Sequence, residues 1–98
     1  MATFITTVKF TQQGIKNIGE STKRAAAIKA MAKKLGAKVK DAYWTMGEHD
    51  GVLIFEAADD ETAAAVMAQV GSLGNVHTST VRAFSSTEMD QILARAQG

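Results

Sequence analysis

The chain has 98 residues, a formal net charge of +1, 46% hydrophobic residues and 21% charged residues, which predicts one folded domain over residues 1–98. It contains no cysteine, so disulfides, thiolate nucleophiles and cysteine-ligated metal centres are excluded, and a reducing, cytoplasmic setting is expected. No segment approaches the roughly 20 apolar residues of a membrane span, and the alternating start of the chain does not resemble a signal peptide.

The first part of the chain predicts a strand followed by a helix. Residues 3–10 alternate between two sets of side chains with the period of two that a strand requires. Residues 21–35 place Ile28, Met31 and Leu35 on one helical face and lysines on the other, so this helix should bury one stripe. The polar, glycine-containing segment between them predicts a short helical turn, and Ser21 or Thr22 is expected to cap the helix that follows.

The rest of the chain predicts three more strands and two more helices. A turn with two glycines joins the second and third strands as a hairpin. Asp59 or Asp60 caps the second long helix, and Ser85 with Glu88 forms a capping box that opens a short terminal helix. The predicted segments after the first helix are, in order, strands over 38–46 and 51–57, a helix over 60–70, a strand over 75–84 and a helix from 86 onward.

This order predicts an α+β fold of the ferredoxin-like βαββαβ type, with a four-stranded antiparallel sheet, two helices on one face and a short C-terminal helix. The other face of the sheet is left uncovered. The first and third strands carry large apolar side chains on both faces, as at Phe4 and Ile5 or Ile54 and Phe55. A face that meets water should be polar, so we expect a second copy of the chain to cover it about a two-fold axis.

Five short segments over almost the whole chain carry a resemblance to a known family. They are ATFIT at 2–6, QGI at 13–15, YWTMG at 43–47, DDETA at 59–63 and GSLGNV at 71–76. Through them the chain resembles the GYD-domain family, which is placed with the dimeric α/β-barrel proteins. The resemblance implies this fold and a dimer or an assembly of dimers, and it implies no reaction. In the name-giving Gly-Tyr-Asp neighbourhood, Gly47 and Asp50 are present and His49 stands where Tyr is expected.

His49 and Asp50 are the candidate catalytic residues, because an imidazole beside a carboxylate can act as a general base with its orienting group. Neighbours in an extended chain point to opposite faces. In the alternative interpretation, Asp50 binds backbone amides of its own turn and His49 is a surface or interface residue. Tyr43, Trp44 and His77 are the candidate ligand-binding residues. For the Tyr43–Trp44 pair, one ring should face the helices and the other the open side, where core or interface packing is the alternative.

Metal, cofactor and nucleic-acid binding are not favoured by the sequence. Two histidines with no cysteine and no metal-binding spacing leave no convincing ligand set, so no metal and no cofactor are predicted. Related barrels that use a histidine for haem are an analogy only. The basic residues between Lys9 and Lys40 would suit a phosphate surface, but the acids between Glu48 and Glu61 balance them.

Two functions remain for comparison with the structure. The leading hypothesis is a non-catalytic, cytoplasmic homo-oligomeric domain whose open sheet face forms a subunit interface, with a small apolar or aromatic ligand bound near it. The alternative is a small enzyme of the dimeric α/β-barrel type that acts on an apolar or aromatic metabolite, with His49 and Asp50 as acid and base. Loss of a bound aromatic molecule in Trp44→Ala, but not in His49→Ala, would favour binding, whereas loss of turnover in His49→Ala would favour the enzyme.

Overall fold

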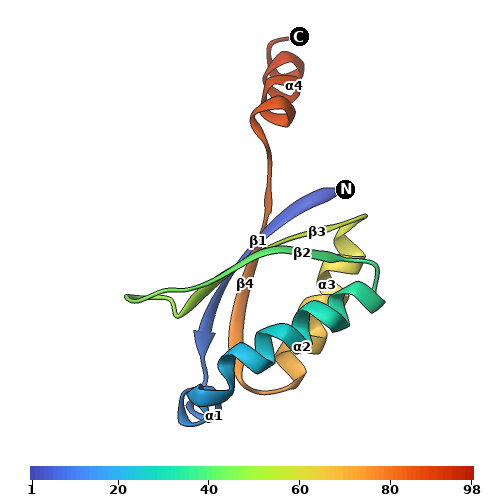
Figure 1. The fold of residues 1–98 in the computed structure, drawn as a ribbon. Coiled ribbons are helices and arrows are strands. Elements are labelled where there is room, and N and C mark those ends of the chain that lie inside the picture. The colour runs from blue at the N-terminus through green and yellow to red at the C-terminus, as the bar shows by residue number, and fades with distance from the viewer.

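Four antiparallel strands form one sheet in the computed structural model, which describes residues 1–98. The strand order is β2-β3-β1-β4 (Figure 1). The sequence-based prediction of a ferredoxin-like α+β fold is therefore confirmed. The elements are, in chain order, β1 (Ala2–Phe10), α1 (Gln12–Lys16), the 3-10 turn η1 (Ile18–Glu20), α2 (Ser21–Lys34), β2 (Lys38–Trp44), β3 (Gly51–Ala57), α3 (Asp60–Ser72), β4 (Val76–Ala83) and α4 (Ser86–Gln97).

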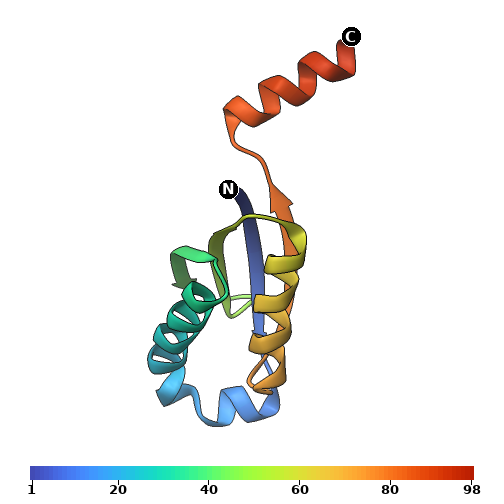
Figure 2. The same cartoon turned by 90° about the vertical axis from the view of Figure 1, so that its right-hand side faces the viewer.

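Helices α2 and α3 cover one face of the sheet, and the core lies between them and the strands (Figure 2). The rings of Phe4 and Phe55 stack with their centroids 5.4 Å apart. Phe55 and Val66 have no solvent exposure, so they form the centre of the core. Helix α2 packs on β2, whereas α3 packs on β3 and β4. The two helices are thus anchored toward opposite edges of the sheet.

The strand register places apolar side chains in two neighbouring rows on the open face of the sheet, with Asp41 beside Ile54 and Thr7 beside Val52 in the same rows. Ile5 of β1 lies opposite Ile54 of β3 and Val81 of β4, and Val52 of β3 lies opposite Tyr43 of β2. We call these five residues the apolar row. Val81 is 58% exposed and Tyr43 is 57% exposed, so the row meets water in a single subunit. The apolar character that the sequence predicted for both sides of β1 and β3 is confirmed.

The helix starts agree with the sequence except at α2. Asp59 caps α3 by accepting the amide of Thr62 at 2.8 Å. The side chain of Thr62 is the main cause that lowers the pKa of Asp59, and the amide of Thr62 adds to it. The expected cap of α2 at Ser21 or Thr22 is wrong, since Glu20 precedes the helix without a side-chain hydrogen bond. The reason is that η1 leads directly into α2, and the amide of Ser21 already donates to the carbonyl of Ile18.

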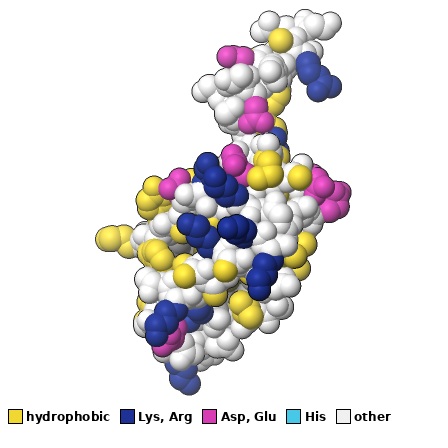
Figure 3. Space-filling view, turned by 45° about the vertical axis from the view of Figure 1, so that its right-hand side comes forward, with side chains coloured by type: hydrophobic (Ala, Val, Ile, Leu, Met, Phe, Trp, Pro, Cys, Tyr) yellow, Lys and Arg dark blue, Asp and Glu magenta, His cyan; other side chains and the backbone are white.

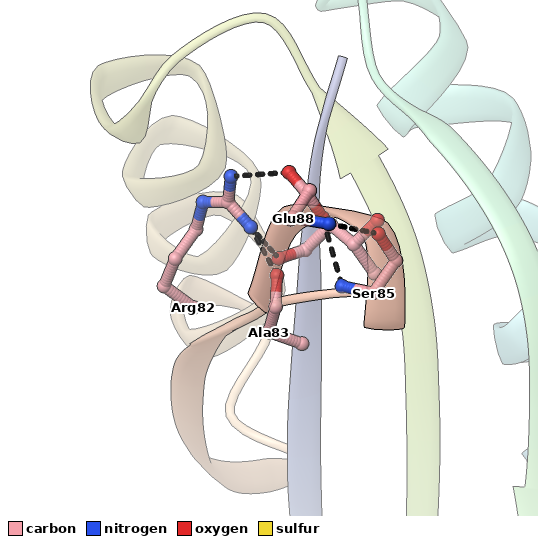
Figure 4. A network of polar contacts seen from close by, with 5 residues as sticks. Arg82, Ala83, Ser85 and Glu88 are labelled. Atoms are coloured by element: carbon pink, nitrogen blue, oxygen red, sulfur yellow. Dashed lines mark hydrogen bonds and ion pairs between the residues drawn. The ribbon is translucent and has the colours of Figure 1, made fainter. Parts of the chain in front are cut away.

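The predicted capping box at the start of α4 is confirmed. The amide of Glu88 donates to Oγ of Ser85 at 3.1 Å, and the amide of Ser85 donates to Oε1 of Glu88 at 2.9 Å (Figure 4). The amide of Ser85 is the main reason why the pKa of Glu88 lies below its ordinary value, and the guanidinium of Arg82 adds to it. The ionised form of Glu88 therefore strengthens the box.

Acidification is expected to fray α4. Because folding lowers the pKa of Glu88, the contribution of this carboxylate to the stability of α4 is complete above the unfolded-state pKa. It is lost as the pH falls through the folded-state pKa. Amide hydrogen exchange in α4, followed from pH 7 to about pH 3, should show protection decreasing at the acidic end. Glu88→Gln keeps the acceptor without the titration, so its α4 should lose this pH dependence. An identical acid response in the wild type and in Glu88→Gln would contradict the assignment of this pH dependence to Glu88.

No helix of the structure combines the length and the apolar character that crossing a bilayer would require.

Candidate functional site

An open, concave hollow lies between the sheet and helices α2 and α3. Most of the lining is apolar, with side chains such as Val8 and Phe10 from β1, Ala25 and Ile28 from α2, and Val70 from α3. The hollow exists because the two helices pack toward opposite edges of the sheet and contact each other little. A concave, mainly apolar site of this kind suits a small molecule.

Arg24 supplies a fixed positive charge to the wall of the hollow. Its Nη1 donates to the carbonyl of Asn17 at 2.9 Å, and its Nη2 donates to the carbonyl of Gly14 at 3.2 Å. The guanidinium also lies 6.0 Å from the ring centroid of Phe10. Neither of the two ion pairs of the chain includes Arg24. Its charge is therefore held in place by backbone carbonyls and is not neutralised by a carboxylate.

Asp50 supplies the negative charge of the lining and ties the β2–β3 turn to β1. Its Oδ2 accepts the amide of Phe10 at 2.8 Å, and its own amide donates to the carbonyl of Val8 at 2.8 Å. The amide bound by the carboxylate thus belongs to β1 and not to the turn of Asp50. The Asp50 carbonyl accepts the amide of Thr45 at 2.9 Å. All three bonds fix the orientation of the carboxylate.

The structure brings some of the candidate residues together and leaves others apart. Trp44 and Asp50 line the hollow, and Trp44 lies opposite Gly51, in the row of Val8 that faces the helices. Tyr43 borders the hollow, but it lies opposite Val52 and so belongs to the apolar row of the open face. His49 is exposed in the β2–β3 turn, where its carbonyl accepts Oγ1 of Thr45 at 2.6 Å. His77 is exposed on the open face. Neither histidine lines the hollow.

The five candidates form no metal centre, because no group of three or more His, Asp or Glu side chains converges in the structure. Polar atoms do reach the floor of the hollow at Thr6, which has no solvent exposure. Its hydroxyl lies 2.8 Å from Oγ1 of Thr80 and 3.6 Å from Sδ of Met67. Because the Thr6 hydroxyl already has partners within the protein, it is not free to bind a ligand, and the floor of the hollow contributes mainly its shape.

Comparison with known proteins agrees with this architecture. Residues 4–93 match the family described as the GYD domain. The chain belongs to the GYD-domain family. No curated protein matches this GYD domain.

Three crystal structures are similar to the GYD domain in fold. FFRP-DM1 has a TM-score of 0.62 at 20% identity, with 86% of this chain and all of that chain covered. TTHA0845 from Thermus thermophilus has a TM-score of 0.58 at 24% identity, covering 88% of this chain and 96% of that chain. The hypothetical protein PHS023 from Pyrococcus horikoshii has a TM-score of 0.62 at 19% identity, covering 88% and 93%. Identities this low support the fold alone.

Two residues of the β2–β3 turn, Gly47 and Asp50, have structural roles in this GYD domain. Gly47 has a φ of +110°, a backbone conformation that favours glycine. Asp50 makes the hydrogen bond to β1 described above. His49 is not among the residues that line the hollow. The glycine and the acid therefore shape the edge of the hollow without forming an acid–base pair with His49.

Sequence reasoning did not single out Arg24, although a signal for it exists. Arg24 stands four residues before Ile28, so it lies on the buried stripe of α2 and not among the exposed lysines of that helix. A charged residue in an apolar stripe is a mark of a lined cavity or an interface. Asn75 was missed for another reason, because its place in the lining depends on how the α3–β4 loop folds back on α1.

Proposed function

We propose that this GYD domain is a non-catalytic binding domain that works as a homo-oligomer in the cytoplasm and holds a small apolar or aromatic molecule in the hollow. The observation that carries the proposal is the mainly apolar lining of a space that the chain itself does not fill. Apolar walls that meet water cost free energy, and a ligand that covers them recovers it. The 49% exposed Trp44 offers a ring against which a flat molecule can pack.

The charged residues of the lining give the ligand an orientation. Arg24 needs little further ordering to bind an acceptor such as a carboxylate, because its guanidinium is already held by two carbonyls. Asp50 carries the opposite charge, so its carboxylate can accept a hydrogen bond from a donor group of the ligand. A molecule with an apolar body and a polar end therefore suits the hollow better than a hydrocarbon does.

Binding is favoured over catalysis by the position of the titratable side chains. His49 is exposed outside the hollow, and Asp50 already accepts a backbone amide. General acid–base catalysis requires a group within hydrogen-bond reach of the reacting atoms, and only Asp50 meets this condition. The proposal also differs from the sequence hypothesis in one respect, since the hollow lies on the helix side of the sheet and the expected subunit interface lies on the other.

Trp44→Ala is expected to weaken binding of an aromatic probe by about tenfold or more, because loss of a ring contact worth more than about 1.4 kcal/mol has that effect. The probe is 8-anilinonaphthalene-1-sulfonate, an aromatic anion whose fluorescence rises in apolar surroundings. Native mass spectrometry of protein purified from its own host would report any molecule carried by the wild type.

His49→Ala is the matched control, since it changes an exposed residue of the adjoining turn and should bind the probe as the wild type does. Equal affinity of the wild type and Trp44→Ala, or a wild type that binds no probe, would contradict the proposed binding function. Loss of a measurable turnover in His49→Ala would instead support the enzyme.

A further inference from the structure

Helix α4 stands apart from the rest of the molecule. It leaves the end of β4 and points away from the sheet and from the two long helices (Figures 1 and 2). In the space-filling view a narrow neck joins it to the body (Figure 3). Its apolar residues recur at helical spacing as Met89, Ile92, Leu93 and Ala96, and Met89 and Leu93 remain 42% and 45% exposed. The helix therefore has an apolar face and almost nothing in its own subunit to pack it against.

The direction of α4 is nevertheless set by the body of the domain. Nη1 of Arg82 donates to the carbonyls of Thr3 and Ala83, and Nη2 contacts Oε2 of Glu88 at 3.2 Å (Figure 4). The same guanidinium lies 5.8 Å from the ring centroid of Phe4 and 4.6 Å from that of Phe84. The base of α4 is thus tied to β1 and β4, and the helix is held out from the domain in one direction.

A helix of this kind requires a partner. The 12 residues of α4 lie at the lower end of the roughly 12–15 residues below which an isolated helix is marginal in water. The capping box and the Arg82 network stabilise its first turn only. Stability along the remaining turns has to come from burial of the apolar face.

The surface area of the subunit is large enough for an interface with a second copy of the chain. The chain exposes 6548 Å², whereas a monomeric protein of 10.4 kDa exposes about 5,400 Å². Its radius of gyration is 14.8 Å, against about 12.6 Å for a globular domain of this length. The excess area of roughly 1,100 Å² exceeds the roughly 800 Å² that each partner buries in a standard stable interface.

Exposed apolar residues continue along the chain from the sheet to α4. Val81 belongs to the apolar row on the open face, and the next exposed apolar residue along the chain is Phe84, which is 52% exposed at the base of α4. We infer that α4 is an exchanged arm, which packs Met89, Ile92 and Leu93 against a second copy of this chain and extends the interface formed by the apolar row. The inference rests on the homo-oligomer of the proposed function and adds a second contact to it.

Leu93→Asp tests the arm in the full-length protein. Sedimentation equilibrium should show the dissociation constant of the oligomer raised at least about hundredfold, because a two-fold interface loses both arms at once. Gln91→Asp introduces the same charge on the opposite side of α4, where it should leave the dissociation constant within about threefold of the wild type. Hydrogen exchange offers a second measurement, since protection of α4 in the wild type should rise with protein concentration.

The outcomes separate the arm from the oligomer itself. Because α4 packs little on its own body, thermal unfolding of Leu93→Asp at low concentration should match that of the monomeric wild type and so exclude a folding defect. An oligomeric wild type whose dissociation constant is unchanged by Leu93→Asp would overturn the arm and leave the oligomer standing. A wild type that is monomeric at every concentration would overturn both.

Discussion

Gly14→Ala is expected to lower the free energy of unfolding by about 2–4 kcal/mol. A Cβ at position 14 would lie 1.9 Å from the carbonyl oxygen and 2.9 Å from the carbonyl carbon of Asn75. Both atoms are backbone, so no side-chain rotation relieves the overlap, and α1 has to move away from the start of β4. That movement would also break the hydrogen bond of 3.0 Å from the amide of Thr11 to the same oxygen.

Gly19→Ala is the matched control for this prediction. Nothing lies within 4 Å of a Cβ at position 19, and the added methyl group reduces the freedom of the unfolded chain, so this variant should be unchanged or more stable by up to about 1 kcal/mol. Thermal unfolding separates the two variants, since the expected loss in Gly14→Ala corresponds to a fall in Tm of more than about 10 °C in a domain of this size. Equal melting temperatures would show that α1 does not pack as described.

Ile5→Lys is expected to dissociate the proposed oligomer, with a dissociation constant raised at least about hundredfold. Ile5 lies on the central strand β1 between Ile54 and Val81, so a lysine there would place a charge in the middle of the apolar row. A two-fold axis would bring two such charges into one interface, where removing them from water costs free energy.

Ala26→Lys adds the same charge at an exposed position of α2 and should leave the association unchanged. Both variants should keep the fold of the subunit, because position 5 faces solvent in the single chain and the core lies on the other side of the sheet. Sedimentation equilibrium of the two variants beside the wild type measures the effect. An Ile5→Lys protein that associates as tightly as Ala26→Lys would place the subunit interface elsewhere.

Local patterns in the sequence were sufficient to predict the elements and the sheet. The alternation along β1 determines which of Phe4 and Ile5 faces the helices, because successive side chains of a strand point to opposite faces. The caps at Asp59 and Ser85 were predictable because each depends on side chains within three residues. The place of β4 beside β1 then follows from the ferredoxin-like fold that the order of the elements predicted.

The hollow could not be predicted in the same way, because it depends on distances between elements. Whether α2 and α3 meet above β1 is decided by packing over the whole sheet, and no local pattern reports the space between them. Arg24 was counted among the solvated basic residues of its helix, although its spacing before Ile28 places it on the stripe that lines this space. Similarly, the apolar face of α4 was visible in the sequence, but periodicity does not say whether such a face packs within its own chain or on another.

The pairing of β1 with β4 also constrains when the domain can fold during synthesis. The central strand β1 is made first, yet one of its two neighbours ends only at Ala83. Arg82, which links Thr3 to the base of α4, emerges later than nearly all of the core. The ribosome therefore releases most of this chain before its sheet can be completed. Until then, the apolar side chains of β1 and β3 remain without their final packing in the nascent polypeptide.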